Sequence, residues 1–223
     1  KTYFLLTLIE ALLQTNAELY ILDPKNADLA DLGTVMPNVY HTKEEMIDCV
    51  NTFYDGMVAR SEEMKQHPNY KTGENYAYLG LPPCFLIFDE YVAFFEMLAT
   101  KESMSLLSQL KKIVMLGRQA GYFLIVACQR PDAKYFSDGI RDNFNFRVGL
   151  GRISELGYGM LFGSDVKKQF FQKRIKGRGY CDVGTSVISE FYTPLVPKGH
   201  DFLQTIGRLA QKQQSTQVQQ EKE

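Results

Sequence analysis

Short apolar runs alternate with amphipathic stretches along this chain, and each run stops at polar residues. Three runs have the length of a buried strand, at residues 19–22, 85–88 and 122–128. Continuous apolar runs of this kind are typical of parallel strands whose two faces are both covered. Between the runs, apolar residues recur at the spacing of amphipathic helices. The alternation predicts an α/β fold with a mainly parallel central sheet flanked by helices.

The helical stretches carry recognisable end signals. The first begins near Thr2 and places leucines and an isoleucine on one face. The second follows Thr42, whose side chain forms a capping box with that of Glu45. The third covers about residues 103–120 and reaches Gly121, a residue type that commonly ends a helix in the left-handed conformation. These signals place one helix before the first strand and one in each interval between strands, as parallel strands require.

The C-terminal quarter has a different pattern. Residues 179–183 and 187–192 alternate around a Gly-Thr-Ser turn, as the strands of a β-hairpin do. Beyond Arg208 the chain becomes rich in glutamine. This composition offers little with which to form a core, so we expect a disordered tail. The chain is thus predicted to form one folded domain over residues 1–207 and a tail over residues 208–223.

Composition limits the class of protein. The 223 residues are 45% hydrophobic, yet no apolar run approaches the roughly 20 residues that a membrane span needs. Lysine and arginine number 25 against 26 aspartate and glutamate residues. Because the net charge of the chain is close to zero, any contact with nucleic acid has to come from a local basic patch. The pattern excludes an integral membrane piece and predicts one domain able to bury a core.

The four cysteines lie far apart in the sequence. None forms a Cys-x-x-Cys pair, and Cys84 and Cys128 fall within the apolar strand runs. Such thiols are more commonly reduced core residues than disulfides or zinc ligands. We therefore expect free thiols, as in a cytosolic compartment.

Two carboxylates follow the second strand run. Asp89 and Glu90 come directly after the apolar residues 85–88. Ligands of open α/β sheets bind beyond the carboxyl ends of the strands. There, one acidic residue can hold Mg²⁺ and a second can activate a water for attack on phosphorus. The pattern is that of a Walker B strand, and the alternative is a buried strand that ends in a solvated Asp-Glu turn.

The first two residues bear on that choice. In a phosphate-binding loop, Gly-x-x-x-x-Gly is followed by a lysine for the β- and γ-phosphates of ATP and by a serine or threonine for Mg²⁺. Lys1 and Thr2 have the residue types of those last two positions and precede a helix. We therefore expect the chain to begin inside a nucleotide-binding loop. Without the glycines, whose backbone N–H groups form much of the phosphate cradle, it is expected to bind nucleotide poorly and to be inactive.

Polar residues also follow the other predicted strands. Gln129 stands after residues 122–128, where an amide can sense the γ-phosphate or orient the attacking water. Asp23 follows residues 19–22 and is interpreted as the cap of a helical turn that begins near Asp28. An arginine, Arg147, lies inside a short apolar strand. It is expected either to meet an anion, such as the γ-phosphate of a neighbouring subunit, or to pair with Asp142 or another carboxylate.

Residues 167–178 form the most basic stretch of the chain. It contains six lysines and arginines and no acidic residue, with Lys173, Arg174 and Lys176 close together. Such a cluster suits the phosphate backbone of DNA. The alternative, which is the common use of a charge run, is a solvated face.

Four stretches together resemble the FtsK/SpoIIIE family of DNA translocases. They are Leu22-Asp23-Pro24-Lys25, Phe88-Asp89-Glu90, Arg118-Gln119-Ala120-Gly121 with the following residues 124–131, and residues 140–148. Their order and spacing agree with the family over about residues 1–200. Within it, the chain looks most similar to the FtsK-like coupling proteins of Gram-positive conjugative elements, the group that includes TcpA and the coupling proteins of conjugative transposons.

The resemblance implies a RecA-like P-loop ATPase that assembles as a homohexameric ring around DNA. It places Lys1 and Thr2 in Walker A, and Asp89 and Glu90 in Walker B. It places Gln129 at the γ-phosphate sensor and Arg147 at the arginine that reaches across the subunit interface. Cys128 departs from the family, which usually has threonine at this position.

The function that this resemblance implies is DNA pumping during conjugation. The chain would be the cytoplasmic motor of a protein anchored in the cell membrane through an N-terminal region. With ATP and Mg²⁺, it would bring DNA bound to its relaxase to a type IV secretion channel. The alternatives are a chromosome-segregation DNA pump, an FtsK-like ATPase for type VII protein export, and an inactive docking platform. No winged-helix module follows residue 200, which favours the conjugative branch over chromosome segregation.

Overall fold

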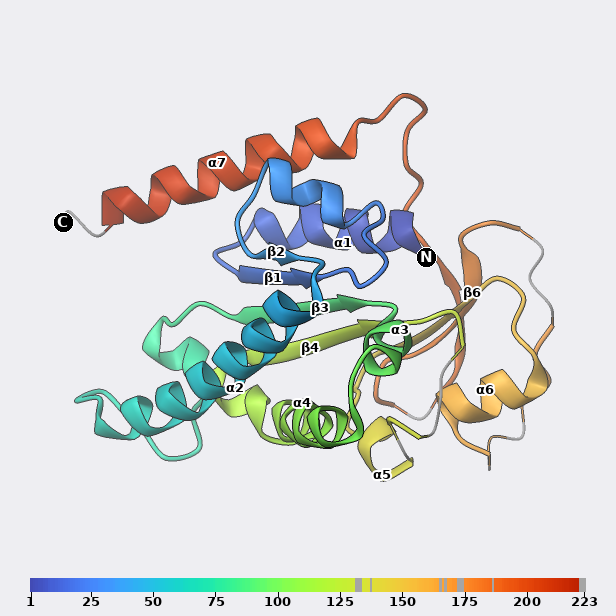
Figure 1. Cartoon of the computed structure of the whole chain (residues 1–223), viewed down its shortest axis with the longest axis horizontal. Helices are drawn as coiled ribbons and strands as arrows, with labels where there is room; N and C mark the ends of the chain where they lie inside the picture. Colours follow the sequence, from blue (N-terminus) through green and yellow to red (C-terminus); the bar gives the residue numbers. More distant parts are fainter. Residues whose placement is uncertain are drawn as a thin grey trace.

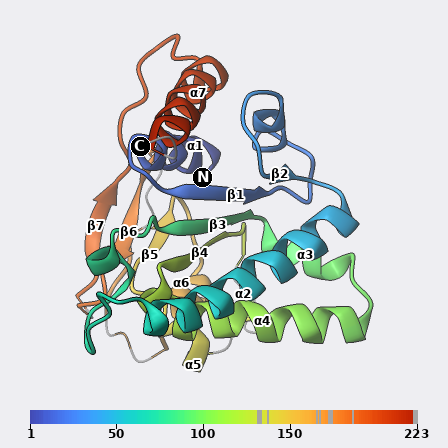
Figure 2. The ribbon, with the colours of Figure 1, turned by 90° about the vertical axis from the view of Figure 1, so that its left-hand side faces the viewer.

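A computed structural model of the chain shows two β-sheets with helices packed around the larger one (Figures 1 and 2). It describes residues 1–130, 134–136, 138–164, 166, 168–171, 175–185 and 187–220. The larger sheet is parallel, with the strand order β2-β1-β3-β4, and the smaller is antiparallel, with the order β5-β6-β7. The strands are β1 (Glu18–Leu22), β2 (Val39–Tyr40), β3 (Cys84–Asp89), β4 (Tyr122–Ala127), β5 (Arg147–Leu150), β6 (Arg178–Asp182) and β7 (Ser189–Tyr192). This arrangement confirms the predicted α/β class, the parallel sheet and the C-terminal hairpin.

Helices cover both faces of the parallel sheet (Figure 2). On one face lie α1 (Thr2–Leu13) and α7 (Phe202–Gln220), and on the other α2 (Lys43–Gln66) and α4 (Thr100–Ala120). The shorter helices are η1 (Ala30–Thr34), η2 (Tyr76–Leu79), α3 (Tyr91–Glu96), α5 (Asp138–Arg141) and α6 (Glu155–Phe162). None of the helices in the described ranges combines the length and hydropathy needed to cross a membrane.

Each face of the sheet has its own hydrophobic core, and β3 contributes to both. Leu86 and Phe88 join the core under α2 and α4, whereas Ile87 joins the core under α1. All three side chains are almost fully buried. Because successive side chains point to opposite faces of a strand, an apolar run without alternation indicates burial on both sides. This physical link made the strands predictable.

Local sequence signals set the helix ends. Thr42 and Glu45 form the predicted capping box at the start of α2. Gly121 ends α4 in the left-handed conformation, with φ of 79°. That helix starts about three residues earlier than its apolar spacing predicts, because the Glu102 carboxylate accepts a hydrogen bond from the backbone N–H of Ala99. The caps therefore refine what periodicity alone gives.

The glutamine-rich stretch differs from the prediction. Helix α7 includes it and packs along α1, burying Ile206 and Ala210. The side-chain amide of Gln213 donates hydrogen bonds to the carbonyl oxygens of Thr15 and Ala17. The prediction of a disordered tail over residues 208–223 is therefore wrong for this helix. Composition hid a sparse apolar stripe, and the proposed boundary after residue 207 falls inside one helix.

Candidate active site

Polar side chains from three strands meet at one edge of the parallel sheet. Leu22 pairs with Phe88, and Asp89 with Ala127, so β1, β3 and β4 run in register and in the same direction. Asp23, Glu90 and Gln129 therefore follow their strands at the same carboxyl edge. This edge is where α/β sheets bind ligands.

Lys1 lies against both carboxylates of β3. Its Nζ is 2.7 Å from Asp89 Oδ1 and 2.9 Å from Glu90 Oε2. Lys25 Nζ lies 3.4 Å from the same oxygen of Glu90. The backbone N–H of Gln129 donates to Glu90 Oε1 at 3.1 Å. Residues that are far apart in the sequence thus form one charge cluster, centred on Glu90.

Glu90 has an unusual backbone conformation for its residue type. It adopts φ of 52° and ψ of 52°, in the left-handed region, and forms the N-cap of α3. Its side chain is buried, with 8% of its surface exposed. Non-glycine residues in this region are uncommon and are concentrated at functional sites, because the surrounding structure has to hold them there. This turn directs the carboxylate toward Lys1 and Gln129.

The cluster shifts the protonation of its members. Burial alone would raise the pKa of Glu90, but the Lys1 ammonium, the Gln129 N–H group and the charge of Lys25 together lower it. Burial likewise opposes the charge of Lys1, but its contacts with Asp89 and Glu90 raise the pKa of its side chain. Both effects favour the charged forms of Lys1 and Glu90 at neutral pH.

Asp23 holds the loop that carries Lys25. Its buried carboxylate accepts hydrogen bonds from the backbone N–H groups of Lys25, Ala27 and Ala30, at 3.2, 2.9 and 3.1 Å. Ala30 is the first residue of η1. Asp23 thus bonds to the first N–H group of a helical turn, as interpreted, but that turn begins at Ala30 and not near Asp28, and its N-cap residue is Leu29. Lys25 was expected only as part of the stretch that resembles the family and not as a site residue, although its place just beyond a strand end was a signal.

The helix that follows Lys1 adds a second attraction for anions. Thr2 begins α1, so the N-terminal end of this twelve-residue helix directly follows Lys1, whose side chain lies in the cluster. The first N–H groups of a helix have no partner within it, and the dipole favours negative charge there. Lys1, Lys25 and this helix end together form a setting suited to phosphate groups.

The oxygen groups beside Lys1 suit an open magnesium site, whose shell water and phosphate complete, better than a metal site closed by protein side chains. Within the described part of the chain, no three His, Cys, Asp or Glu side chains are placed to hold a metal. Mg²⁺ usually takes one or two carboxylates and completes its shell with water and phosphate oxygens. Asp89 and the Thr2 hydroxyl are groups of this kind.

The end of β4 carries Cys128 and Gln129. Burial raises the pKa of the Cys128 thiol to about 11, so it is neutral at physiological pH. The Gln129 side chain is exposed, while its backbone N–H binds Glu90. Arg152, which no sequence signal marked, lines the same cavity as Lys1 and Gln129.

Arg147 lies in the smaller sheet, outside this cluster. Its Nη2 is 2.6 Å from Asp182 Oδ2, and its Nη1 is 3.5 Å from Asp142 Oδ1. Arg147 and Asp182 are directly opposite each other in the pairing of β5 with β6. Of the two alternatives for this arginine, the structure has the one in which it pairs with a carboxylate of its own chain.

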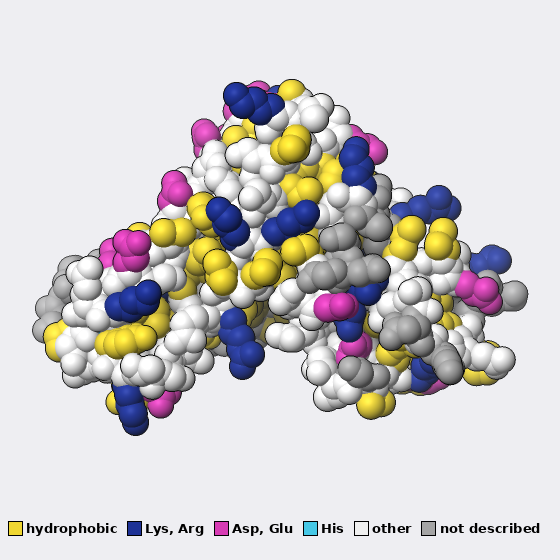
Figure 3. Space-filling model, turned by 90° about the horizontal axis from the view of Figure 1, so that it is seen from below, with side chains coloured by type: hydrophobic (Ala, Val, Ile, Leu, Met, Phe, Trp, Pro, Cys, Tyr) yellow, Lys and Arg dark blue, Asp and Glu magenta, His cyan; other side chains and the backbone are white. Residues whose placement is uncertain are grey.

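The basic stretch is only partly described. Lys173 and Arg174 lie outside the described residues, and Lys176 is exposed in the turn before β6. On the face drawn in Figure 3, the lysines and arginines that are coloured lie among apolar and acidic side chains. DNA binding by this stretch stays a prediction.

The comparisons with known proteins agree with this fold. No protein-family model matches the chain. Over 207 residues the chain is 58% identical to the FtsK domain-containing protein YdcQ of Bacillus subtilis (strain 168). The aligned region covers 92% of the chain but 43% of YdcQ. The chain thus spans less than half the length of that relative.

Solved structures with the same fold include secretion ATPases and a conjugation coupling protein. One is the conjugation coupling protein TcpA of pCW3, in a monomer form with ATPγS. The match covers 91% of this chain and 59% of the TcpA chain, with a TM-score of 0.69 and 18% identity. Another is the cytoplasmic domain of the type VII secretion ATPase EccC of Thermomonospora curvata. The match covers 92% of this chain and 26% of the EccC chain, with a TM-score of 0.61 and 19% identity. At these identities the likeness concerns the fold. The 58% identity to YdcQ over 92% of the chain shows that the chain is a homologue of an FtsK domain-containing protein.

Proposed function

We propose that this chain is the ATP-hydrolysing motor domain of a DNA coupling protein. The observation that carries the proposal is the cluster of Lys1, Asp89 and Glu90 at the carboxyl edge of the parallel sheet, beside the N-terminal end of α1. A triphosphate needs cations and N–H groups around its phosphates, a carboxylate for Mg²⁺ and a base for the attacking water. This edge supplies all of them except the loop that would precede Lys1.

In this proposal each residue has one task. Lys1 would exchange its carboxylate contacts for the β- and γ-phosphates, while Thr2 and Asp89 would hold Mg²⁺. Glu90, which Lys1 then leaves, accepts the proton of the attacking water, and Gln129 orients that water. The magnesium ion would neutralise charge that develops on the phosphate oxygens. Because Glu90 is ionised in the cluster, it is ready to act as a base.

The DNA assignment comes from relatives and from the basic stretch. TcpA is a conjugation coupling protein by name, and YdcQ carries an FtsK domain. We propose that Lys173, Arg174 and Lys176 contact the phosphate backbone and that the full-length protein forms a hexameric ring. The relaxase, the secretion channel and an anchor in the membrane belong to the same proposal. In the ring, Arg147 would leave Asp182 to reach the γ-phosphate of the neighbouring subunit.

ATP hydrolysis by the full-length protein tests the proposal. We expect DNA to stimulate turnover, and Lys1→Ala to abolish nucleotide binding, because the ammonium that faces the phosphates is lost. Lys71→Ala, in an exposed loop, is a control that should leave both unchanged. Turnover that no form of DNA stimulates would contradict the DNA assignment, and nucleotide binding by Lys1→Ala would contradict the site.

Protein export is the second candidate function. It is favoured by the match to EccC and to EssC of Geobacillus thermodenitrificans, which has a TM-score of 0.62 and 16% identity over 94% of the chain. One EccC structure is described as a complex with a signal sequence peptide. Turnover that responds to an exported protein's signal peptide and not to DNA would select this function.

A further inference from the structure

Glu90 is contacted from both neighbouring strands of the parallel sheet. The strand order β2-β1-β3-β4 places β3, which ends just before Glu90, between β1 and β4. From the β4 side, the backbone N–H of Gln129 donates to Glu90 Oε1 at 3.1 Å. From the β1 side, Lys25 Nζ lies 3.4 Å from Glu90 Oε2. Each carboxylate oxygen therefore has a contact from beyond a different strand, and Lys1 adds a further contact at Oε2.

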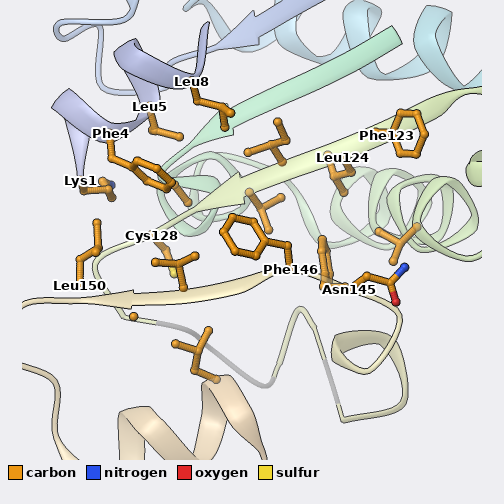
Figure 4. A pocket seen from close by; sticks show the side chains of 18 of the residues that line it. Lys1, Phe4, Leu5, Leu8, Phe123, Leu124, Cys128, Asn145, Phe146 and Leu150 are labelled. Atoms are coloured by element: carbon orange, nitrogen blue, oxygen red, sulfur yellow. The ribbon is translucent and has the colours of Figure 1, made fainter. Parts of the chain in front are cut away.

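The two lysines at Glu90 differ in their surroundings. Lys1 borders a cavity of about 630 Å³, and Figure 4 shows it at the end of that cavity near Cys128. The described residues that line this cavity include Lys1 and Gln129, but not Lys25 or Glu90. The Lys1 side chain therefore has space beside it in which to turn away from Glu90. Lys25 contacts Glu90 from the side of β1 and need not move with Lys1.

The backbone of the loop that carries Lys25 is held by one buried residue. The Asp23 carboxylate accepts hydrogen bonds from the backbone N–H groups of Lys25, Ala27 and Ala30. The carbonyl oxygen of Asp23 accepts a fourth from the backbone N–H of Asn26 at 3.0 Å. Asp23 itself is only 1% exposed. The start of the Lys25 side chain is therefore fixed relative to the end of β1, and movement of Lys25 is limited to its own side chain.

The contact between Lys25 and Glu90 is poorly suited to stabilising the fold. The Lys25 side chain is 44% exposed, against 8% for that of Glu90. Ion pairs with an exposed partner contribute little to stability, because water competes for the charges and the long side chain loses freedom. Glu90 has a left-handed backbone conformation, which persists only where the surroundings hold it. Lys25 is therefore better placed to direct the Glu90 carboxylate than to stabilise the domain.

We propose that Lys25 is a positioning residue for Glu90. The inference rests on the proposed function, in which Lys1 leaves Glu90 for the phosphates. Among the described residues, Lys25 is then the cation that remains at Glu90 Oε2. It holds this oxygen while the N–H group of Gln129 holds the other, so the attacking water meets a base with a fixed direction. Proton transfer to the base requires such close and aligned geometry.

The kinetics of ATP hydrolysis by the full-length protein test this role. Lys25→Met removes the charge but keeps an unbranched side chain, and should lower kcat by about 10- to 100-fold. KM and nucleotide affinity should stay unchanged, because Lys25 acts on the base and not on the nucleotide. Lys25→Arg supplies another cation and should keep most of kcat. Lys43→Met, which removes an ion pair with Glu102 outside the cluster, is the matched control.

Two kinetic results would contradict the proposal. Normal kcat in Lys25→Met would mean that Glu90 is directed without Lys25. A higher KM with normal kcat would mean that Lys25 contacts the phosphates and not the base.

The reactivity of the Lys25 amine gives a readout that does not depend on hydrolysis. With ATPγS bound to the full-length protein, an amine-reactive ester should label Lys25 about 2- to 5-fold faster in Glu90→Gln than in the wild type, because the amide does not pair with an ammonium ion as a carboxylate does. Lys43, whose partner is unchanged, should be labelled equally in both proteins. Mass spectrometry of the peptides measures the labelling. Equal labelling of Lys25 in both proteins would show that it does not contact Glu90 when nucleotide is bound, and would overturn the proposal.

Failure of this inference can be told apart from failure of the proposed function. If Glu90→Gln stops hydrolysis but Lys25→Met leaves kcat unchanged, Lys25 is not a positioning residue and the proposed function stands. If Glu90→Gln keeps normal turnover, or Lys1→Ala keeps nucleotide affinity, the proposed function is wrong and the role of Lys25 is wrong with it.

Discussion

Two buried charge clusters in this molecule differ in how much freedom their members have. At the carboxyl edge of the parallel sheet, the Glu90 carboxylate contacts two lysines and accepts a hydrogen bond from a backbone N–H group, and the Lys1 side chain is 29% exposed. In the smaller sheet, Arg147 and Asp182 face each other across neighbouring strands, with side chains 14% and 3% exposed. The first cluster joins loop and helix ends, whereas the second joins two paired strands.

The difference indicates different uses. Lys1 can leave Glu90 by rotation of its own side chain, since Lys25 and the Gln129 N–H group still accompany the carboxylate. If Arg147 leaves Asp182, it strands a carboxylate whose other contact among the described residues is the N–H group of Gly184. Burying a charge without its partner costs several kcal/mol. The cluster at the strand ends is therefore suited to exchange its partners for a ligand, and the pair in the small sheet is suited to hold the fold.

The largest expected effect comes from Glu90→Gln. The substitution keeps size and shape but removes the base, so ATP hydrolysis by the full-length protein should fall by about 10²- to 10⁴-fold while ATP still binds. Glu96→Gln, an exposed residue at the end of the same helix α3, is the matched control and should keep full activity. Turnover and nucleotide affinity are measured together. Near-normal turnover in the Glu90 variant would exclude it as the group that activates water.

The second effect concerns the fixed pair. Arg147→Ala should lower the free energy of unfolding of the domain by about 3 kcal/mol, because Asp182 is left buried without its arginine. Replacing both residues with leucine should restore most of that loss, since no charge is then stranded. Urea titration of the single and double variants measures the difference.

Activity separates this structural role from one in a neighbouring subunit. If Arg147 also reaches a neighbour's γ-phosphate, the double leucine variant should be stable yet lose on the order of 10³-fold in hydrolysis. Inactive Arg147 and Glu90 variants should then partly rescue each other in mixed rings. A stable double variant with full activity would leave Arg147 as a structural residue alone.

Much of the fold could be predicted because its signals are local. The apolar run of β3 indicated burial on both faces, and Thr42 and Gly121 marked helix ends that the structure confirms. The end of the chain could not be read in this way. Helix α7 is held by the packing of Ile206 and Ala210 against α1, which lies at the opposite end of the sequence. Composition contains no information on such a contact.

The candidate site could likewise be predicted only where its residues follow from local signals or from the topology of the sheet. Asp89 ends a parallel strand, and Glu90 and Gln129 lie just beyond strand ends, so their common edge follows from topology. The partner of Arg147 depends on which residue of β6 lies opposite, and register between strands is set by packing and turns that the sequence shows only weakly. Lys25 joins Glu90 because Asp23 folds its loop, a contact that needs three dimensions.

The smallest effect, and the one that tests the exchangeable cluster most directly, is the pH dependence of Lys1→Met. The lowered pKa of Glu90 means that its pairing stabilises the fold above its unfolded pKa of about 4.3, and that this stability is lost as pH falls through the folded pKa. The raised pKa of Lys1 means that its share is complete below about pH 10.4 and is lost as pH rises through the folded pKa. The wild type should therefore exceed the variant in free energy of unfolding most clearly between about pH 5 and pH 10, with the difference shrinking on both sides.

Urea titrations of the domain at about pH 3, 7 and 11 measure this window. The matched control is Lys43→Met, because Lys43 Nζ pairs with Glu102 at the same 2.9 Å but the Glu102 side chain is 40% exposed. Exposed pairs contribute little, so that variant should differ from the wild type by less than about 1 kcal/mol at every pH. A pH-independent difference for Lys1→Met would mean that its effect comes from packing of the lysine stem and not from the charges. Glu90 would then have no need of Lys1 to stay ionised, and the exchange of Lys1 from carboxylate to phosphate would lose its electrostatic basis.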